Sequence, residues 1–139
     1  MKKSYFLSGS LELSYDDELS TAYAVWNGFL SSEEFREATQ KCIELMEEQG
    51  ITRWLADNRK MRVIRQADQQ WFAETIIPRM LNTSLRRIAT LVSEDVFNKM
   101  AVEQLMQRAN SKEQMTIRDF NQEAAALAWL MAPLSQAAV

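Results

Sequence analysis

Hydrophobic and polar residues follow two different periods along the chain. Each change from one period to the other marks a boundary between a predicted strand and a predicted helix. Alternation with a period of two predicts strands, and apolar residues that recur every three or four positions predict amphipathic helices. The strand pattern covers residues 4–13, 20–27, 51–57, 85–92 and 114–120. The helix pattern covers residues 32–49, 68–81, 95–109 and 122–131.

The helix over residues 32–49 has the clearest signals at its ends. Ser31 and Glu34 have the spacing of a capping box, in which each side chain accepts a hydrogen bond from the backbone of the other residue. Gly50 stands where a left-handed residue often ends a helix. The predicted buried stripe of this helix consists of Phe35, Ala38, Cys42, Leu45 and Met46.

The sequence also predicts which faces of the other helices are buried and where two of these helices begin or end. Pro78 is expected to kink its helix or to end it near Ile77, because proline has no amide hydrogen to donate. The last helix is expected to begin at an N-cap, Asn121. The face predicted to be buried in the helix over 95–109 consists of Phe97, Met100, Ala101 and Leu105. The corresponding face over 122–131 consists of Ala124, Leu127, Ala128 and Met131.

The order of these elements is β-β-α-β-α-β-α-β-α. Strands that alternate with helices predict an α/β fold whose mixed, mainly parallel sheet has about five strands, covered by four helices. The first two strands are close enough to form a hairpin, which makes the first strand an antiparallel edge. Because no linker or repeat interrupts the pattern, we expect a single domain over residues 1–139. An exposed edge strand also offers a route to a homodimer.

Composition removes several classes of chemistry. The chain of 139 residues contains no His, which excludes Ser-His-Asp and Cys-His catalysis and histidine metal sites. Its one cysteine, Cys42, excludes an intramolecular disulfide and lies on an apolar stripe, so it is expected to be a buried hydrophobe. The chain also lacks a P-loop and a G-x-G-x-x-G motif. We therefore expect no enzyme, no metal and no cofactor.

Hydrophobic runs and net charge bear on location and partners. No apolar run reaches the length of a transmembrane helix or of a signal peptide core, so a cytoplasmic protein is expected. The net charge is −3, although residues 53–87 hold 8 basic and 3 acidic residues. Nucleic acid is not an expected partner because the whole chain is acidic. The basic stretch either balances the acidic first helix in solvent or binds an anion or an acidic partner.

The segment 58–70 is both basic and amphiphilic. Met61, Val63 and Ile64 stand between its arginines, either as anchors of a long connection or as the cover of a ligand cavity. Open α/β sheets bind ligands beyond the carboxyl ends of their strands, which is where this segment begins. A mobile flap of arginines could bind the head group of an amphiphilic anion while Met61 and Ile64 touch a pocket. The candidate binding residues are Asp57, Asn58, Arg59, Lys60, Arg62, Arg65, Trp71 and Phe72.

Short motifs near the strand ends and in the last helix resemble one family. They are Trp26-Asn27-Gly28, Leu55-Ala56-Asp57, Arg87-Ile88-Ala89, Ile117-Arg118-Asp119-Phe120, Glu123-Ala124 and Ala128-Trp129-Leu130. Over residues 20–131 the chain resembles the SpoIIAA-like branch of the STAS/SEC14 superfamily. The resemblance implies the same α/β fold and a non-enzymatic regulatory or protein-interaction module.

The same resemblance brings one departure and one alternative. Partner-switching STAS proteins carry a phosphorylatable Ser or Thr just after the third strand, whereas residues 58–70 contain no Ser, Thr or Tyr. Control by phosphorylation at this site is therefore not expected. The SEC14 side of the resemblance implies the alternative function, a carrier or sensor of a small amphiphilic or lipid-like anion, with a pocket near residues 57–72.

Overall fold

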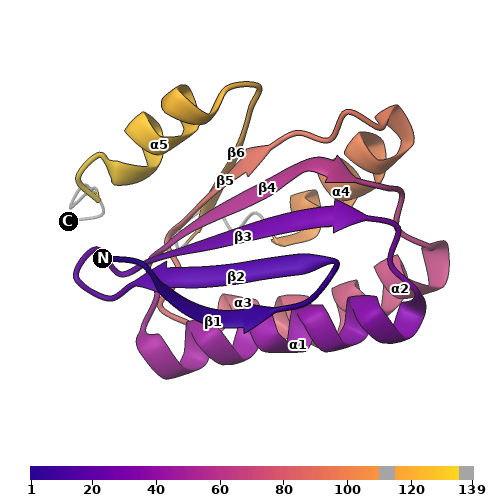
Figure 1. The fold of residues 1–139 in the computed structure, drawn as a ribbon, viewed down its shortest axis with the longest axis horizontal. Coiled ribbons are helices and arrows are strands. Elements are labelled where there is room, and N and C mark those ends of the chain that lie inside the picture. Colours follow the sequence, from indigo (N-terminus) through magenta and orange to yellow (C-terminus); the bar gives the residue numbers. More distant parts are fainter. Residues whose placement is uncertain (110–114, 135–139) are drawn as a thin grey trace.

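A computed structural model, which describes residues 1–109 and 115–134, shows one α/β domain built on a mixed six-stranded sheet (Figure 1). The strands are β1 (Lys3–Leu7), β2 (Leu11–Asp16), β3 (Thr21–Gly28), β4 (Arg53–Met61), β5 (Arg87–Leu91) and β6 (Thr116–Phe120). They lie in the sheet in chain order. β1, β2 and β3 are antiparallel neighbours, and β3 to β6 are parallel. The predicted fold class is confirmed.

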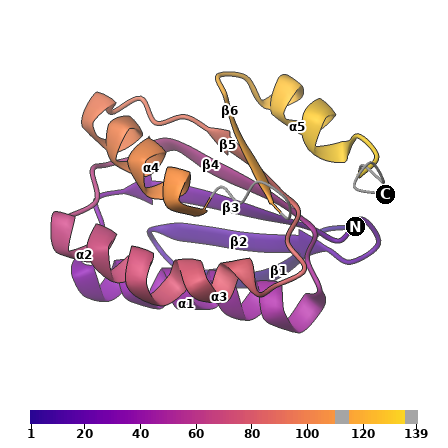
Figure 2. The same ribbon diagram turned by 180° about the vertical axis from the view of Figure 1, so that it is seen from behind.

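Helices cover both faces of the sheet, but unequally. They are α1 (Ser32–Gln49), α2 (Gln66–Trp71), the π-helical turn η1 (Phe72–Ile76), α3 (Ile77–Leu81), α4 (Val96–Ala109) and α5 (Glu123–Met131). Figures 1 and 2 show α1 to α4 on one face of the sheet and α5 on the other. Each face has a core of its own, because successive residues of a strand point to opposite sides. On β4, for example, Trp54 belongs to the larger core and Leu55 to the smaller one under α5.

The sheet has six strands because the segment predicted as one strand over 4–13 is a hairpin of two. The hydroxyl oxygen of Ser8 accepts hydrogen bonds from the amides of Ser10 and Leu11, at 3.2 and 3.1 Å. A serine side chain that binds the backbone in this way stabilises a turn. The alternation continues across the turn, which is why the sequence pattern did not reveal it.

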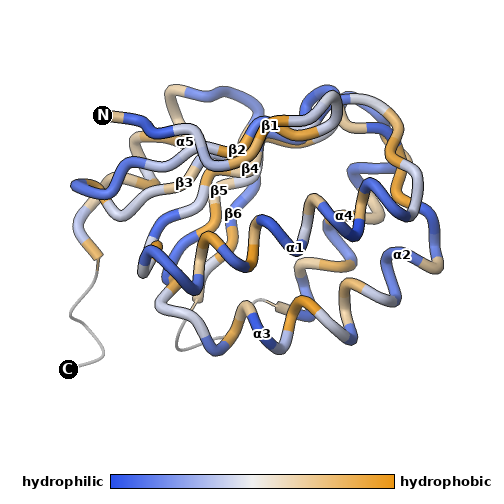
Figure 3. Tube along the Cα trace, turned by 60° about the horizontal axis from the view of Figure 1, so that its bottom comes forward, coloured by the Kyte–Doolittle hydropathy of each residue, from blue (hydrophilic) through white to orange (hydrophobic). Residues whose placement is uncertain are grey.

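α1 forms as its sequence predicts. Ser31 and Glu34 make both bonds of the capping box, and Gly50 ends the helix with a φ of 59°. The whole predicted stripe, Phe35 to Met46, is buried. In Figure 3 the hydrophobic positions of α1 recur at intervals between hydrophilic ones, as expected for a helix with one face against a sheet.

The helical segment that contains Pro78 neither ends near Ile77 nor stays a regular α-helix. The amide of Ile77 donates to the carbonyl of Phe72, five residues earlier, and the helix continues as α3 to Leu81. Proline cannot donate a bond and its ring crowds the preceding turn. The widened π-helical turn accommodates both effects within one helical segment.

The predicted faces of the last two helices need correction. In α4, Ala101 and Leu105 are buried as expected, but Phe97 and Met100 are exposed. Asn98 takes an interior position, where its amide donates to the carbonyl of Met61 at 3.4 Å, and this contact turns the helix.

α5 buries Ala126 and Leu130, whereas Ala124 and Ala128 are exposed. Its N-cap is Gln122, without a side-chain bond, and not Asn121. An alanine-rich helix is apolar on every side, so periodicity alone does not select the buried face.

Candidate functional site

The loops that follow the parallel strands are held together at the carboxyl end of the sheet. The amide of Arg62 donates to the carbonyl of Gly28 at 2.9 Å, which links the end of β4 to the end of β3. The hydroxyl of Ser93, after β5, donates to the carbonyl of Met61 at 2.8 Å. The carboxyl ends of β3, β4 and β5 therefore form one surface, the usual place for a site in such a sheet.

β4 is longer than the sequence predicted, and this divides the candidate residues between two sides of the sheet. The strand runs to Met61 instead of ending at Asp57, so Arg59 and Lys60 belong to the sheet and not to a flap. Its pairing with β3 shifts register between Val25 and Asn27. Such a bulge adds a residue to one strand and redirects its side chains.

Asp57, Arg59 and Lys60 lie on the side of α5, where they line a surface groove of about 540 Å³. Arg59 binds Asp57 through two hydrogen bonds, of 3.0 and 2.8 Å, and lies 3.3 Å from Glu123 of α5. Partial burial acts to raise the pKa of Asp57, but the bonds from Arg59 outweigh this effect and hold that pKa below its ordinary value. The Arg59 guanidinium is thus already engaged with carboxylates of the domain.

The remaining candidates lie on the side of α1 to α4. Arg62 and Arg65 are exposed, and the Arg65 guanidinium lies 5.8 Å from the ring centre of Phe29. Trp71 is half-buried beneath Arg36, whereas Phe72 is buried. The structure therefore separates the arginines from the apolar residues, although the sequence predicted one binding site that contains both.

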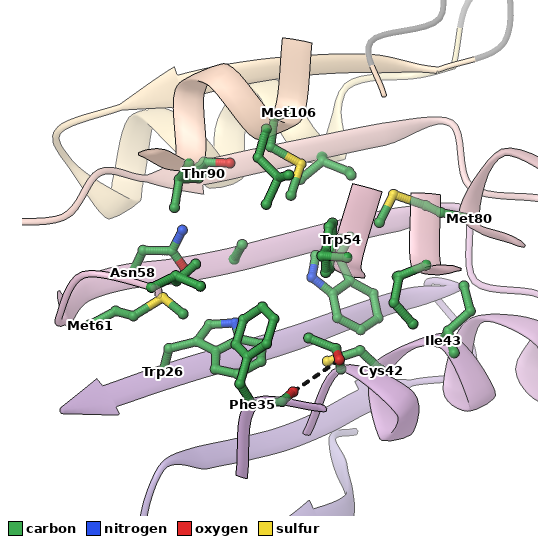
Figure 4. Close-up of a pocket in the computed structure, with 18 of the residues that line it drawn as sticks. Trp26, Phe35, Cys42, Ile43, Trp54, Asn58, Met61, Met80, Thr90 and Met106 are labelled. Atoms are coloured by element: carbon green, nitrogen blue, oxygen red, sulfur yellow. Dashed lines mark hydrogen bonds between the residues drawn. The ribbon is translucent and has the colours of Figure 1, made fainter. Parts of the chain in front are cut away.

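Between the sheet and α1 to α4 lies a cavity of about 70 Å³ (Figure 4). Of the eight candidate residues, Asn58 and Phe72 line it, together with the predicted pocket residues Met61 and Ile64. None of the candidate arginines lines it. Its walls come from all parts of this half of the fold and include four methionines, Met46, Met61, Met80 and Met106.

Polar atoms line this cavity on the sheet side. They are the indole N–H groups of Trp26 and Trp54, the amide of Asn58 and the hydroxyl of Thr90. All four side chains are buried, and none of their polar groups is hydrogen-bonded to a residue that the structure describes. In the same part of the chain, the side-chain atom that is both fully buried and without a partner is Asn98 Oδ1, which does not line the cavity. The polar atoms of the four lining side chains are therefore within reach of water or of a small molecule inside the cavity.

Sequence reasoning did not select Trp26, Trp54 and Thr90. The signal was present in part, because Trp26 alternates with Ala22 and Ala24 on one face of its strand. Thr90 is the polar member of an otherwise apolar run in β5. Which of these side chains share a cavity depends on the register between strands, and no single strand contains that information.

Cys42 also lines the cavity, and it has the inert environment that its position on α1 predicted. Burial raises the pKa of the thiol far above its ordinary value. Because the thiolate is the nucleophile, a thiol that stays protonated is unreactive at neutral pH.

Two further features are absent from the described ranges, 1–109 and 115–134. No cluster of three or more His, Cys, Asp or Glu residues is arranged to hold a metal ion there. No helix in the same ranges is both long and apolar enough to span a bilayer.

Comparison with known proteins identifies the family. The model of the SpoIIAA-like family matches residues 21–131 of the 139-residue chain. The chain belongs to the SpoIIAA-like family. No match was found among curated proteins or among solved structures.

The SpoIIAA-like match begins with β3 and ends with α5, so it contains both the cavity and the loops at the carboxyl ends of the strands. The hairpin partners β1 and β2 lie before it. SpoIIAA-like domains are of the STAS type, a class of regulatory and interaction modules that are generally not catalytic.

Proposed function

We propose that this SpoIIAA-like domain is a non-enzymatic regulatory module that binds a protein partner through the carboxyl ends of its parallel strands. One observation carries the proposal, the exposure of large apolar side chains at this end. Phe29 is 56% exposed and Phe97 is 75% exposed, and Val96 and Met100 beside Phe97 are exposed too. Exposed apolar and aromatic side chains of this size are typical of interaction surfaces.

Charge at the same end supports a protein partner. Arg62 and Arg65 lie on the loop after β4, and neither forms an ion pair with the residues that the structure describes. We name the carboxyl-end surface by its residues, Phe29, Arg62, Arg65, Val96, Phe97 and Met100. Arginine and aromatic residues are enriched where binding energy concentrates in protein interfaces.

Control of such a contact by phosphorylation is not expected in the segment 58–70, which has no hydroxyl side chain. α2 begins there at Gln66, and the acidic residue in its first turn is Asp68. This carboxylate accepts hydrogen bonds from Ser32 at 2.8 Å and from Arg36 at 3.3 Å. A cytoplasmic location, a homodimer through the β1 edge and the absence of nucleic-acid binding remain predictions of the sequence.

The proposal is tested by comparing protein complexes in the native cell. Tagged wild-type protein is purified beside a Phe97→Ser/Met100→Ser variant, with Glu37→Ser on the exposed face of α1 as the matched control. We expect one partner that copurifies with the wild type and the control and is lost from the double variant. Equal recovery with all three proteins would show that the partner binds elsewhere. Equal urea midpoints exclude unfolding as the cause of a loss.

The cavity favours a second candidate function, a carrier or sensor of a small amphiphilic or lipid-like anion. The apolar part of such a ligand would enter beside Phe72 and Ile64, which line the cavity. Its head group would stay outside, toward the exposed Arg62 and Arg65. Native mass spectrometry of protein purified from its own cells tests this candidate. A bound molecule of constant mass would support it, and protein at its bare mass would favour the protein-contact function.

A further inference from the structure

We propose that the cavity binds a small neutral molecule that has an apolar body and a hydrogen-bond acceptor, such as a ketone, an ester or an amide. This inference rests on one part of the second candidate function, namely that the cavity holds a small ligand. It differs in the ligand class, because the lining residues favour a neutral group over the anion that the basic sequence suggested.

The first step is the absence of charge. The residues that line the cavity in the described part of the chain include no Asp, Glu, Lys or Arg. Arg59 is bound to Asp57 on the other face of the sheet, and Arg62 and Arg65 are exposed to solvent. A carboxylate drawn into this cavity would lose its hydration without gaining a counter-charge, which is strongly unfavourable. A ligand that enters completely is therefore neutral.

The second step is the excess of donors. The indole groups of Trp26 and Trp54 donate and cannot accept, whereas Asn58 and Thr90 can do both. They come from three neighbouring strands, β3, β4 and β5, and Figure 4 shows them around a common space. Buried tryptophan N–H groups usually have an acceptor. In this cavity a ligand oxygen can supply it.

The third step is size. A cavity of about 70 Å³ is well below the ~300–1,000 Å³ of sites for drug-sized ligands, so the molecule is small. Met46, Met61, Met80 and Met106 give the walls room to adapt. Methionine is unbranched and has several rotatable bonds, so it repacks around guests of different shape. Most of the remaining lining is aliphatic or aromatic, which suits a hydrocarbon body.

The four tryptophans provide a built-in experiment. Trp26 and Trp54 line the cavity, whereas Trp71 and Trp129 do not. In ¹⁵N-labelled protein each indole N–H gives its own NMR signal, which single Trp→Phe variants assign. Three probes of one skeleton are added in turn, namely cyclohexanone, methylcyclohexane and cyclohexanecarboxylate. We expect cyclohexanone to shift the signals of Trp26 and Trp54 saturably while those of Trp71 and Trp129 stay in place.

A matched variant isolates the polar contact. Thr90→Val keeps the shape of the side chain and removes its hydroxyl, so it should weaken cyclohexanone about two- to tenfold, the effect of one hydrogen bond. Binding of methylcyclohexane should not weaken. An equal loss of affinity for both probes would show that the Thr90 hydroxyl does not bind the ligand oxygen, which would overturn this part of the inference. Unchanged signals of Trp71 and Trp129 show that the variant is folded.

The charged probe separates two kinds of failure. If cyclohexanecarboxylate shifts the signals of Trp26 and Trp54 at the same concentrations as the ketone, the neutral-ligand inference is wrong and the carrier function stands. If none of the three probes shifts these signals, the cavity does not admit such molecules. The neutral-ligand inference and the carrier function are then both overturned. A response of all four tryptophans alike would indicate non-specific binding and would also contradict the inference.

Discussion

The hydroxyl of Ser93 donates a hydrogen bond of 2.8 Å to the carbonyl oxygen of Met61, and both groups are buried. This contact joins the loop after β5 to the last residue of β4. Asn98 donates to the same carbonyl at 3.4 Å. The carbonyl of Met61 thus binds both the loop after β5 and helix α4, while the side chain of Met61 lines the cavity. The carboxyl-end surface and the cavity consequently share a structural support.

We predict that Ser93→Ala lowers the free energy of unfolding by about 1 kcal/mol, the net value of a typical buried hydrogen bond. The exposed Ser4, which makes no side-chain hydrogen bond with the described residues, gives the matched control Ser4→Ala. The control should stay within about 0.5 kcal/mol of the wild type. Urea unfolding measures both. Equal urea midpoints of the two variants would show that the Ser93 hydroxyl does not stabilise the carboxyl end of the sheet.

Phe35 should be among the side chains that contribute most to stability. Its ring is buried and lies 6.1 Å from Phe72, 6.3 Å from Trp26 and 6.3 Å from Trp71, between centroids. Phe35→Ala is expected to cost about 3–5 kcal/mol, because it empties a space that the sheet and α1 cannot close. Glu37→Ala, on the exposed side of the same helix, should stay within about 0.5 kcal/mol. Comparable urea midpoints would contradict the packing of α1.

The Cys42 thiol should resist alkylation as long as the protein is folded. Its burial against the cavity raises its pKa, so almost no thiolate exists at neutral pH. Iodoacetamide at pH 7.5 should modify the protein in urea and leave it unmodified in buffer, as measured by intact mass. Rapid modification in buffer would show that the cavity around Cys42 opens to solvent.

The ion pair between Asp57 and Arg59 predicts a dependence of stability on pH. Because the folded domain lowers the pKa of Asp57, this group stabilises the fold above the ordinary value of 3.8 and loses its effect as the pH falls below it. Asp57→Asn should cost roughly 0.5–1 kcal/mol at pH 7, since Arg59 is partly exposed and solvent screens the pair. The difference from the wild type should shrink as the pH falls from 3.8 through the lowered pKa of Asp57. A constant difference across this range would indicate a purely steric effect.

Several parts of the fold could be predicted from the sequence because local physics determines them. The capping box of Ser31 and Glu34 acts within four residues, and Gly50 needs only its own backbone conformation. β5 is buried on both faces, which agrees with the nearly continuous apolar character of its sequence. These features do not depend on how distant segments meet.

The site was harder to predict because it depends on distant contacts. The pairing of β4 with β3 extends to Met61, and that pairing turned Arg59 and Lys60 from a presumed loop into a strand. α4 turns because Asn98 reaches the carbonyl of Met61, 37 residues earlier. The exposure of Phe97 follows from this rotation. The main apolar residue of the carboxyl-end surface was therefore assigned to the core by periodicity alone.

Site-specific photo-crosslinking tests the central claim, contact through the carboxyl-end surface, most directly. Benzoylphenylalanine is placed at position 97 or, as the control, at position 37 on the outer face of α1, and the native cells are irradiated. We predict one discrete protein adduct from position 97, identified by mass spectrometry, and none from position 37. The same adduct from both positions, or no adduct from position 97, would contradict the proposed interaction surface.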